Sequence, residues 1–256
     1  MLTKASMLTK ASIYAGTSWD PVVGCDPVSE ACANCIAQRR VARKARSGNP
    51  KYQGVLTEDD RWNGVVKALP ENLETPSEWT SPRRVFVAGN SDLFHAGVEG
   101  DYISKVFEVM ARNQKHLFFV ATKRIVRAAQ WFEMSPDYHY PPNLVLMATA
   151  ENQRRLDERW DGLSRCPVSV RALSVEPMLG PLDLKGRRPD WVVVGQEEGL
   201  NSRPTDPDWV AAFVGQCRSL GTRMFIKPMP GVPEELGLPR ELPSPCLQTP
   251  LSVRRG

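Results

Sequence analysis

The chain has 256 residues, 41% hydrophobic and 24% charged, with a formal net charge of +4. This length suits one large globular domain, and a single α/β barrel is often of this size. The weak positive charge permits a phosphate-bearing partner without requiring one, because nucleic-acid-binding patches are usually denser. No apolar run approaches the ~18 residues of a membrane span and no signal-peptide core is present, so we expect no membrane partner and a cytoplasmic location.

The N-terminus contains an exact duplication, since Met1–Ser6 and Met7–Ser12 are identical. We interpret residues 1–12 as a doubled start that does not belong to the fold, and we predict the folded domain over residues 13–228. The polar residues 47–81 are expected to form an insertion after the first helix. The proline-rich residues 229–256 are expected to form an extended C-terminal tail.

Apolar segments of strand length recur along the chain, and helix-like stretches follow most of them. A weak first strand is expected around Ser12–Ala15. The stronger strands are predicted at Arg84–Ala88, Leu117–Ala121, Leu144–Ala148, Arg171–Val175, Trp191–Val194 and Arg223–Ile226. Their nearly continuous apolar character is typical of parallel strands that are covered on both faces. Helices are predicted at Cys35–Arg46, Tyr102–Asn113, Ile125–Phe132, Gln153–Trp160 and Asp208–Leu220.

The alternation of strands and helices indicates the α/β class and a sheet of parallel strands. Six or seven βα units predict a partial TIM-like barrel, (β/α)6–7, with its functional face at the carboxyl ends of the strands. A flat, doubly wound sheet is the structural alternative.

Half of the six cysteines are concentrated in one short segment, where Cys25, Cys32 and Cys35 form a C-x6-C-x2-C arrangement. Cysteines of a reducing compartment do not indicate disulfides, and thiolates are preferred ligands of iron–sulfur clusters and zinc. A [4Fe–4S] cluster that only transfers electrons usually has four cysteine ligands. Three cysteines leave one iron open to another ligand, so the motif predicts a cluster that also performs chemistry. Cys166, Cys217 and Cys246 are interpreted as incidental thiols.

Several segments resemble the radical SAM superfamily, in a branch of three-cysteine proteins, many of them encoded by phages, with this wider cysteine spacing. The resemblance is carried by Thr17–Cys25 and the cysteines, Asn90–His95, Thr122–Arg124, Ser174–Leu182 and Arg203–Val210, and covers about residues 12–228. The sequence departs from the superfamily's commonest spacing, C-x3-C-x2-C. It also has Ile36 where the branch often has an aromatic residue, and Gly-Gln-Glu-Glu-Gly at residues 195–199 where Gly-Gly-Glu-Ser-Gly is usual.

The resemblance implies an enzyme in which S-adenosylmethionine binds the open iron of a [4Fe–4S] cluster held by the three cysteines. An electron from the reduced cluster would then release a 5′-deoxyadenosyl radical that abstracts hydrogen from the substrate. A reductant such as flavodoxin or ferredoxin would supply that electron. Our first hypothesis for the substrate is a modified pyrimidine base of phage DNA, rearranged by an isomerase or mutase reaction in the host cytoplasm. A peptide or a small metabolite is the alternative substrate.

Polar residues that follow the predicted strands are candidates for binding S-adenosylmethionine. Its amino and sulfonium cations favour carboxylates and carbonyls, and its ribose favours Asn, Asp or Glu. The candidates are Asn90, Ser91, Asp92, Thr122, Lys123, Glu151, Asn152, Glu176 and Glu197, and His95 is a further functional candidate. A helix cap or a salt bridge is the alternative role for each of them, particularly for Asp92 and Asn152.

Two alternatives from other classes remain. A zinc-binding, nucleic-acid-associated module would combine the three cysteines with a histidine, although structural zinc ligands usually come as two close pairs and no second pair is present. In a small interaction or structural protein, the cysteines would be chemically inert.

Overall fold

The computed structural model describes residues 15–135, 140–199, 201–229, 232 and 241–243. The doubled start at residues 1–12 and most of the tail predicted at residues 229–256 therefore lie outside the described residues. The same holds for Cys246 and for His139.

The centre of the fold is a seven-stranded sheet in which every neighbouring pair of strands is parallel. In spatial order the strands are β1 (Thr17–Trp19), β4 (Arg84–Val87), β5 (Leu117–Thr122), β6 (Leu144–Thr149), β7 (Val170–Val175), β8 (Trp191–Val194) and β9 (Arg223–Ile226). The α/β class and the parallel sheet are thus confirmed, as are the six stronger strands. Of the strand expected around Ser12–Ala15, only Ala15 lies among the described residues, and the first strand described there, β1, begins at Thr17. Its pairing with β4 and the burial of Trp19 fix β1 in the sheet.

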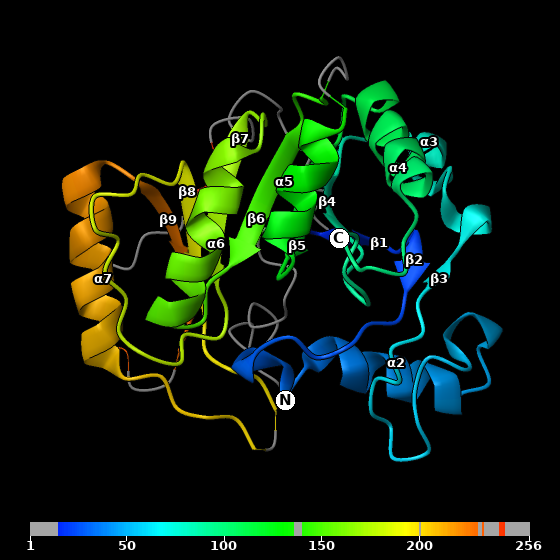
Figure 1. Cartoon of the computed structure of the whole chain (residues 1–256), viewed down its shortest axis with the longest axis horizontal. Coiled ribbons are helices and arrows are strands. Elements are labelled where there is room, and N and C mark those ends of the chain that lie inside the picture. Colours follow the sequence, from blue (N-terminus) through cyan, green and yellow to red (C-terminus); the bar gives the residue numbers. More distant parts are fainter. Residues whose placement is uncertain (1–14, 136–139, 200, 230–231, 233–240, 244–256) are drawn as a thin grey trace.

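Four helices cover one face of this sheet, as Figure 1 shows. They are α4 (Gly100–Arg112), α5 (Ile125–Glu133), α6 (Gln153–Arg165) and α7 (Pro207–Leu220). The strands lie side by side in chain order, and right-handed crossovers in one direction place every helix on the same face. A doubly wound sheet reverses its order in the middle. The observed order therefore argues against the doubly wound alternative.

Both faces of the sheet are buried, which explains the continuous apolar character of the strands. Phe118 and Leu146 face the helices, whereas Phe119 and Trp191 belong to a smaller apolar cluster on the opposite face. The described residues 241–243 contribute to this second face, because Leu242 packs against the cluster and the indole Nε1 of Trp191 donates to the Glu241 carbonyl at 2.9 Å. Each fully buried large apolar side chain stabilises the fold by roughly 1.5–3 kcal/mol.

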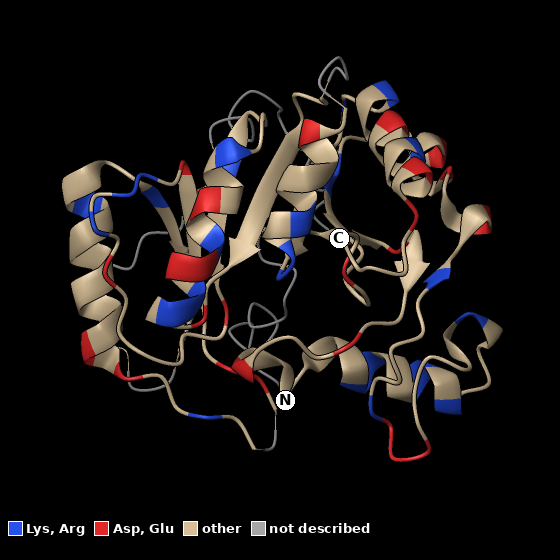
Figure 2. Ribbon diagram, in the orientation of Figure 1, with Lys and Arg blue, Asp and Glu red and all other residues tan. Residues whose placement is uncertain are grey.

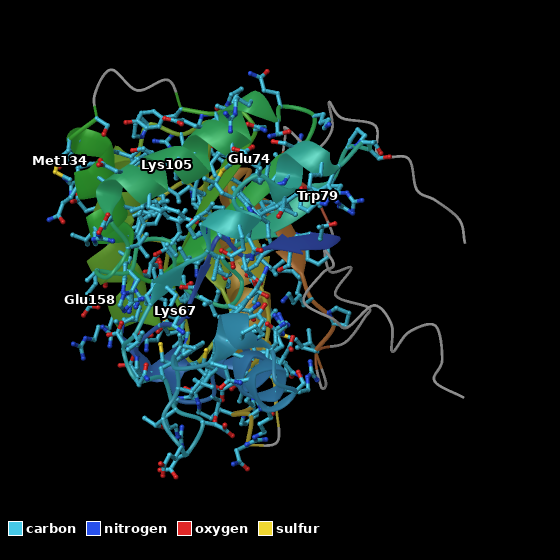
Figure 3. All side chains as sticks on the ribbon, turned by 90° about the vertical axis from the view of Figure 1, so that its right-hand side faces the viewer. Lys67, Glu74, Trp79, Lys105, Met134 and Glu158 are labelled. Carbon is cyan, nitrogen blue, oxygen red and sulfur yellow. The ribbon has the colours of Figure 1, made fainter. Side chains whose placement is uncertain are left out.

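A second, smaller layer comes from the long connection between β1 and β4. It contains β2 (Val22–Val23), η1 (Glu30–Cys32), α2 (Ile36–Arg46), η2 (Pro50–Tyr52), β3 (Lys67–Ala68), η3 (Pro70–Asn72) and α3 (Thr75–Glu78), with β2 and β3 paired antiparallel. Val41 of α2 is packed with Tyr52, Val55 and Trp62 of residues 47–81 in a separate apolar cluster. The segment predicted as an insertion therefore supports α2. In Figure 3, Lys67 lies between the α3–α4 region and the α2 layer.

The helices are amphipathic surface helices. Within the described ranges, no helix combines the length and the apolar character that crossing a membrane would require. Met134, directly after α5, is the most exposed of the large hydrophobic side chains at 75%, and Figure 3 shows it at the surface. It stands as a single exposed residue, which is normal for a protein surface.

Candidate functional site

A cavity of about 470 Å³ lies between the sheet and the α2 layer. One side, which we call the strand-end wall, consists of residues at or just after the carboxyl ends of the sheet strands. The other side is the cysteine loop, residues 24–35, together with the start of α2 and Trp62. Carboxyl ends of parallel strands are where α/β enzymes place their binding sites.

All three cysteines of the predicted motif line this cavity, and each is a half-buried free thiol. Cys25 and Cys35 also pack against the apolar cluster that supports α2. The backbone N–H of Val28 donates to the sulfur of Cys32 at 3.5 Å. N–H groups directed at sulfur are among the features by which proteins tune cluster ligands.

Burial first, and then the nearby carboxylate of Asp92, raise the pKa of the Cys25 thiol to about 12, although the guanidinium of Arg124 opposes the shift. The thiol is therefore protonated at neutral pH even with Arg124 beside it. A bound metal centre reverses that balance, because coordination displaces the proton from the sulfur.

Thiolate sulfur is the donor that iron–sulfur clusters take, and the cavity is lined by three cysteines that could supply it. Among the residues that the structure describes, no group of three or more His, Cys, Asp or Glu side chains is placed to hold one metal ion. A cubane bonds each cysteine to a different iron, so its ligands are spread around the group they hold. Cys25, Cys32 and Cys35 come from one loop and border one cavity, which matches that requirement.

The zinc alternative needs a histidine with a vacant nitrogen, and His95 has none. Its Nδ1 accepts from the backbone N–H of Gly97 at 3.0 Å, so its Nε2 carries the proton and donates to Asp26 Oδ1. His116 is also engaged at both ring nitrogens, with Arg83 N–H and the Pro76 carbonyl.

A network of charged groups joins the strand-end wall to the cysteine loop. Asp92 accepts from the Thr122 hydroxyl at 2.7 Å and from the Lys123 backbone N–H at 3.1 Å. The same carboxylate pairs with Arg124 Nη1 at 3.1 Å, and this nitrogen lies 3.6 Å from the sulfur of Cys25. Arg124 Nη2 contacts both the carbonyl and the carboxylate of Asp26. Arg124 therefore fixes Cys25 and its neighbour to the ends of β4 and β5.

Asn90 and Ser91 stabilise the loop in which Cys25 lies. The Asn90 side chain donates to Asp20 at 2.5 Å and does not line the cavity, and its Oδ1 is buried without a hydrogen-bond partner among the described residues. Ser91 lines the cavity, but its hydroxyl donates to the Gly24 carbonyl. Burial raises the pKa of Asp20, although its hydrogen bonds with Asn90 oppose the shift.

Glu197 connects the loop after β8 to the cysteine loop. Its Oε2 accepts from Asn34 Nδ2 at 2.7 Å and from Arg203 Nε at 2.9 Å, and Arg203 also pairs with Oε1. Burial alone would raise the pKa of Glu197, but the hydrogen bonds from Arg203 and Asn34 outweigh it and lower this pKa to about 2. Arg203 additionally donates to the Glu30 carbonyl at 2.9 Å. Asn34 lies between Cys32 and Cys35, so these contacts hold the part of the loop that carries two of the thiols.

Of the remaining residues predicted to bind S-adenosylmethionine, two line the cavity and two have structural roles. Lys123 and Glu176 line the cavity, and Glu176 pairs with Lys227. Glu151 does not line it: this fully buried carboxylate pairs with Arg159 Nη1 at 2.7 Å. Asn152 is the N-cap of α6, where its side chain accepts from the Arg155 N–H, which is the alternative role foreseen for it.

Sequence reasoning did not single out several residues that matter here. Asp26 and Arg124 were available as the residues next to Cys25 and Lys123, and Asn34 lies within the cysteine motif itself. Arg203 stood in a segment that carried the resemblance but was given no role, and Lys227 carried no local signal, because loops far along the chain bring both to the site.

The fold and the cavity define an α/β protein with three free cysteines beside the carboxyl ends of a parallel sheet. The chain belongs to the family described as "Protein of unknown function (DUF5131)", whose model matches residues 10–235. No curated protein and no solved structure matches the chain.

Proposed function

We propose that the protein is a radical SAM enzyme in which Cys25, Cys32 and Cys35 hold a [4Fe–4S] cluster. The observation that carries this proposal is the meeting of all three cysteines in one cavity with the strand-end wall of a parallel sheet. The cavity volume of about 470 Å³ lies in the range of sites for small ligands and cofactors.

When bound and reduced, the cluster supplies the electron that splits S-adenosylmethionine and so produces the radical that takes hydrogen from the substrate. The chain's own residues position the ligands for that chemistry. Arg124 holds Cys25 against Asp92, and Asn34 with Glu197 holds the segment of Cys32 and Cys35. Both arrangements keep the thiols in place before the cluster binds.

The contacts narrow the set of residues that would hold S-adenosylmethionine. Asn90 and Glu151 do not line the cavity, and Asp92, Ser91 and Glu197 are engaged in holding loops together. Glu176 is also paired, but its partner Lys227 lines the same cavity, so this pair borders the cavity and does not join distant loops. Lys123 borders the cavity as well, and there a carboxylate suits the cationic amino group and an ammonium suits the carboxylate of the methionine part. We therefore assign these two residues to cofactor binding.

For the substrate we propose a modified pyrimidine base in DNA, which the enzyme rearranges in an isomerase or mutase reaction. Hydrogen abstraction from carbon suits such a rearrangement, and the chain's positive net charge of +4 is compatible with a polyanion. A peptide or small metabolite is the alternative substrate. A flavodoxin or ferredoxin would be the reductant.

The sheet would curve into a partial (β/α)6–7 barrel around the cavity. Two features support this curvature: the strands follow chain order, and the face away from the helices has its own buried apolar cluster. An experimental structure with a flat sheet and solvent on that face would contradict it.

Anaerobic reconstitution tests the cluster directly. We expect about four iron and four sulfide per chain, absorption near the ~400 nm region, and formation of 5′-deoxyadenosine from S-adenosylmethionine under reducing conditions. Cys32→Ala should abolish all three results. Cys166→Ser is the matched control, because Cys166 is buried at the end of α6 and its sulfur donates to the Gly162 carbonyl, which a hydroxyl also does. A single zinc per chain, or full turnover by Cys32→Ala, would refute the proposal.

A further inference from the structure

Helix α2 carries an unusual concentration of positive charge. Its eleven residues include five basic and no acidic side chains: Arg39, Arg40, Arg43, Lys44 and Arg46. The net charge of the whole chain is +4, so the chain outside α2 is slightly acidic. Figure 2 shows the basic residues along α2, whereas acidic and basic residues alternate on α6. The positive charge of the molecule is therefore a local property of this helix.

Most of this charge is not neutralised within the protein. Arg46 pairs with Asp60, whereas among the described residues Arg39 donates to the backbone carbonyls of Asn34 and Glu198 and to no carboxylate. Within the described part of the chain, the side chains of Arg40 and Arg43 have no hydrogen bond or ion pair. Three arginines that are free of carboxylate partners thus lie along one helix, and guanidinium groups match the geometry of phosphate oxygens.

The basic side of α2 lies opposite the buried residues that anchor the helix. Gln38, Val41 and Ala42 are the buried residues of the helix, and they occupy the side opposite to Arg40 and Arg43 at the helical repeat. A basic amphipathic helix that binds a membrane needs a free apolar face. The apolar face of α2 is already packed against residues 47–81. The helix therefore has a charged face but no free apolar face that could insert into a membrane.

One end of the basic face borders the cavity. Ile36 and Arg40 both line it, and Ile36 is an exposed large hydrophobic residue at 37%. A charged surface with an apolar group at the mouth of a cavity suits a nucleic-acid strand. The phosphates of such a strand can lie along the protein surface, and its bases can leave the stack.

We propose that the outer face of α2, formed by Arg39, Arg40 and Arg43, binds the phosphate backbone of a single-stranded nucleic acid and directs one nucleotide past Ile36 into the cavity. This inference rests on the proposed function for the fate of that nucleotide, but the binding itself needs neither the reduced cluster nor S-adenosylmethionine. The strand is single because a base inside a duplex cannot reach the cavity unless it leaves the stack.

The test measures binding of a fluorescent oligothymidylate of about 20 nucleotides by anisotropy between about 50 and about 200 mM salt. The Arg40→Gln/Arg43→Gln variant should weaken binding about ten-fold at the lowest salt and reduce the slope of log K against log salt by about 1.4, or ~0.7 per lost contact. Crosslinking with a strand that contains 5-iodouracil should modify the peptide that includes Ile36–Arg46.

The control removes the same charge from another helix. Lys105→Gln/Arg112→Gln changes two exposed residues of α4, which lies away from α2 in Figure 1, and should leave affinity and slope unchanged. An equal loss in both variants, an unchanged slope in the α2 variant, or tighter binding of a matched duplex would overturn the inference. Binding of the α2 face to anionic lipid vesicles in place of the oligonucleotide would also overturn it.

Iron content and 5′-deoxyadenosine formation, measured on the same samples, separate this inference from the proposed function. Loss of α2-dependent binding in a protein that has its cluster refutes the inference alone. Binding that depends on α2 in a protein that takes up no iron supports the inference and refutes the radical chemistry.

Discussion

The two sides of the cavity are held in place by different forces. The strand-end wall is an extension of the sheet, whose strands bury apolar side chains on both faces. The cysteine loop has little core of its own, and polar contacts hold it to distant segments, through Asn34 with Glu197 and Arg203 with Glu30. Arg124 contacts both the Cys25–Asp26 segment and the carboxylate of Asp92 in the wall, and His95 joins Asp26 to the Asp92 carbonyl.

This difference predicts that substitutions in the wall change the stability of the domain, whereas substitutions in the loop contacts change the geometry of the site. A change in the wall acts on the cooperative core and should lower the free energy of unfolding of the whole domain. A change in the contacts of the loop removes one or two hydrogen bonds at the periphery, so it should loosen the thiols while the domain stays folded. Each prediction below tests this separation.

The largest effect is expected at the buried pair of Glu151 and Arg159 behind the wall. Glu151 is fully buried, and its Oε1 has no hydrogen-bond partner among the described residues. Arg159→Met removes the ion pair of 2.7 Å and leaves a buried carboxylate uncompensated, which should cost about 3–5 kcal/mol. Urea unfolding followed by circular dichroism measures this loss.

The double variant Glu151→Gln/Arg159→Met is the control, because it removes the uncompensated charge and should regain part of the stability. Iron uptake at a temperature where the variants are folded should match that of the wild type. A variant with normal stability that cannot bind S-adenosylmethionine would instead return Glu151 to the role of a cofactor ligand.

The sequence was sufficient to predict the wall but not the contacts of the loop. Burial on both faces gives each sheet strand a continuous apolar signature, and adjacent parallel strands place Asp92 near Thr122 and Lys123. Asn34 and Glu197 are 163 residues apart in sequence, and their contact depends on two irregular loops that leave no periodic pattern. Residue type was also ambiguous, since a buried carboxylate such as Glu151 suits an ion pair as well as a cofactor.

Glu197 should show an intermediate effect that depends on pH. Its pKa in the folded protein is about 2, below the ordinary value of 4.5, so the carboxylate stabilises the fold above about pH 4.5 and loses that contribution as pH falls toward 2. Glu197→Gln should therefore be less stable than the wild type by roughly 2 kcal/mol at pH 6, with the difference shrinking at lower pH. Chemical unfolding between pH 3 and pH 6 measures it, and a difference that does not change over this range would contradict the assignment.

The smallest effect on stability and the clearest effect on the site are expected for Asn34→Ala. This change removes the donor at 2.7 Å from Glu197, while Arg203 continues to pair with that carboxylate, so the domain should lose only about 1 kcal/mol. The segment between Cys32 and Cys35 loses its direct side-chain hydrogen bonds to the loop after β8 and keeps the link through Arg39, so the reconstituted cluster should bleach several-fold faster in air. Asn63→Ala is the matched control, because the Asn63 side chain donates to the Gly54 and Leu56 carbonyls within residues 47–81 and not to the cysteine loop. Equal bleaching rates in Asn34→Ala and in the wild type would mean that the fixed position of this segment does not depend on Glu197, and the contacts of Arg203 with Glu30 and of Arg124 with Cys25 and Asp26 would then be what holds the loop.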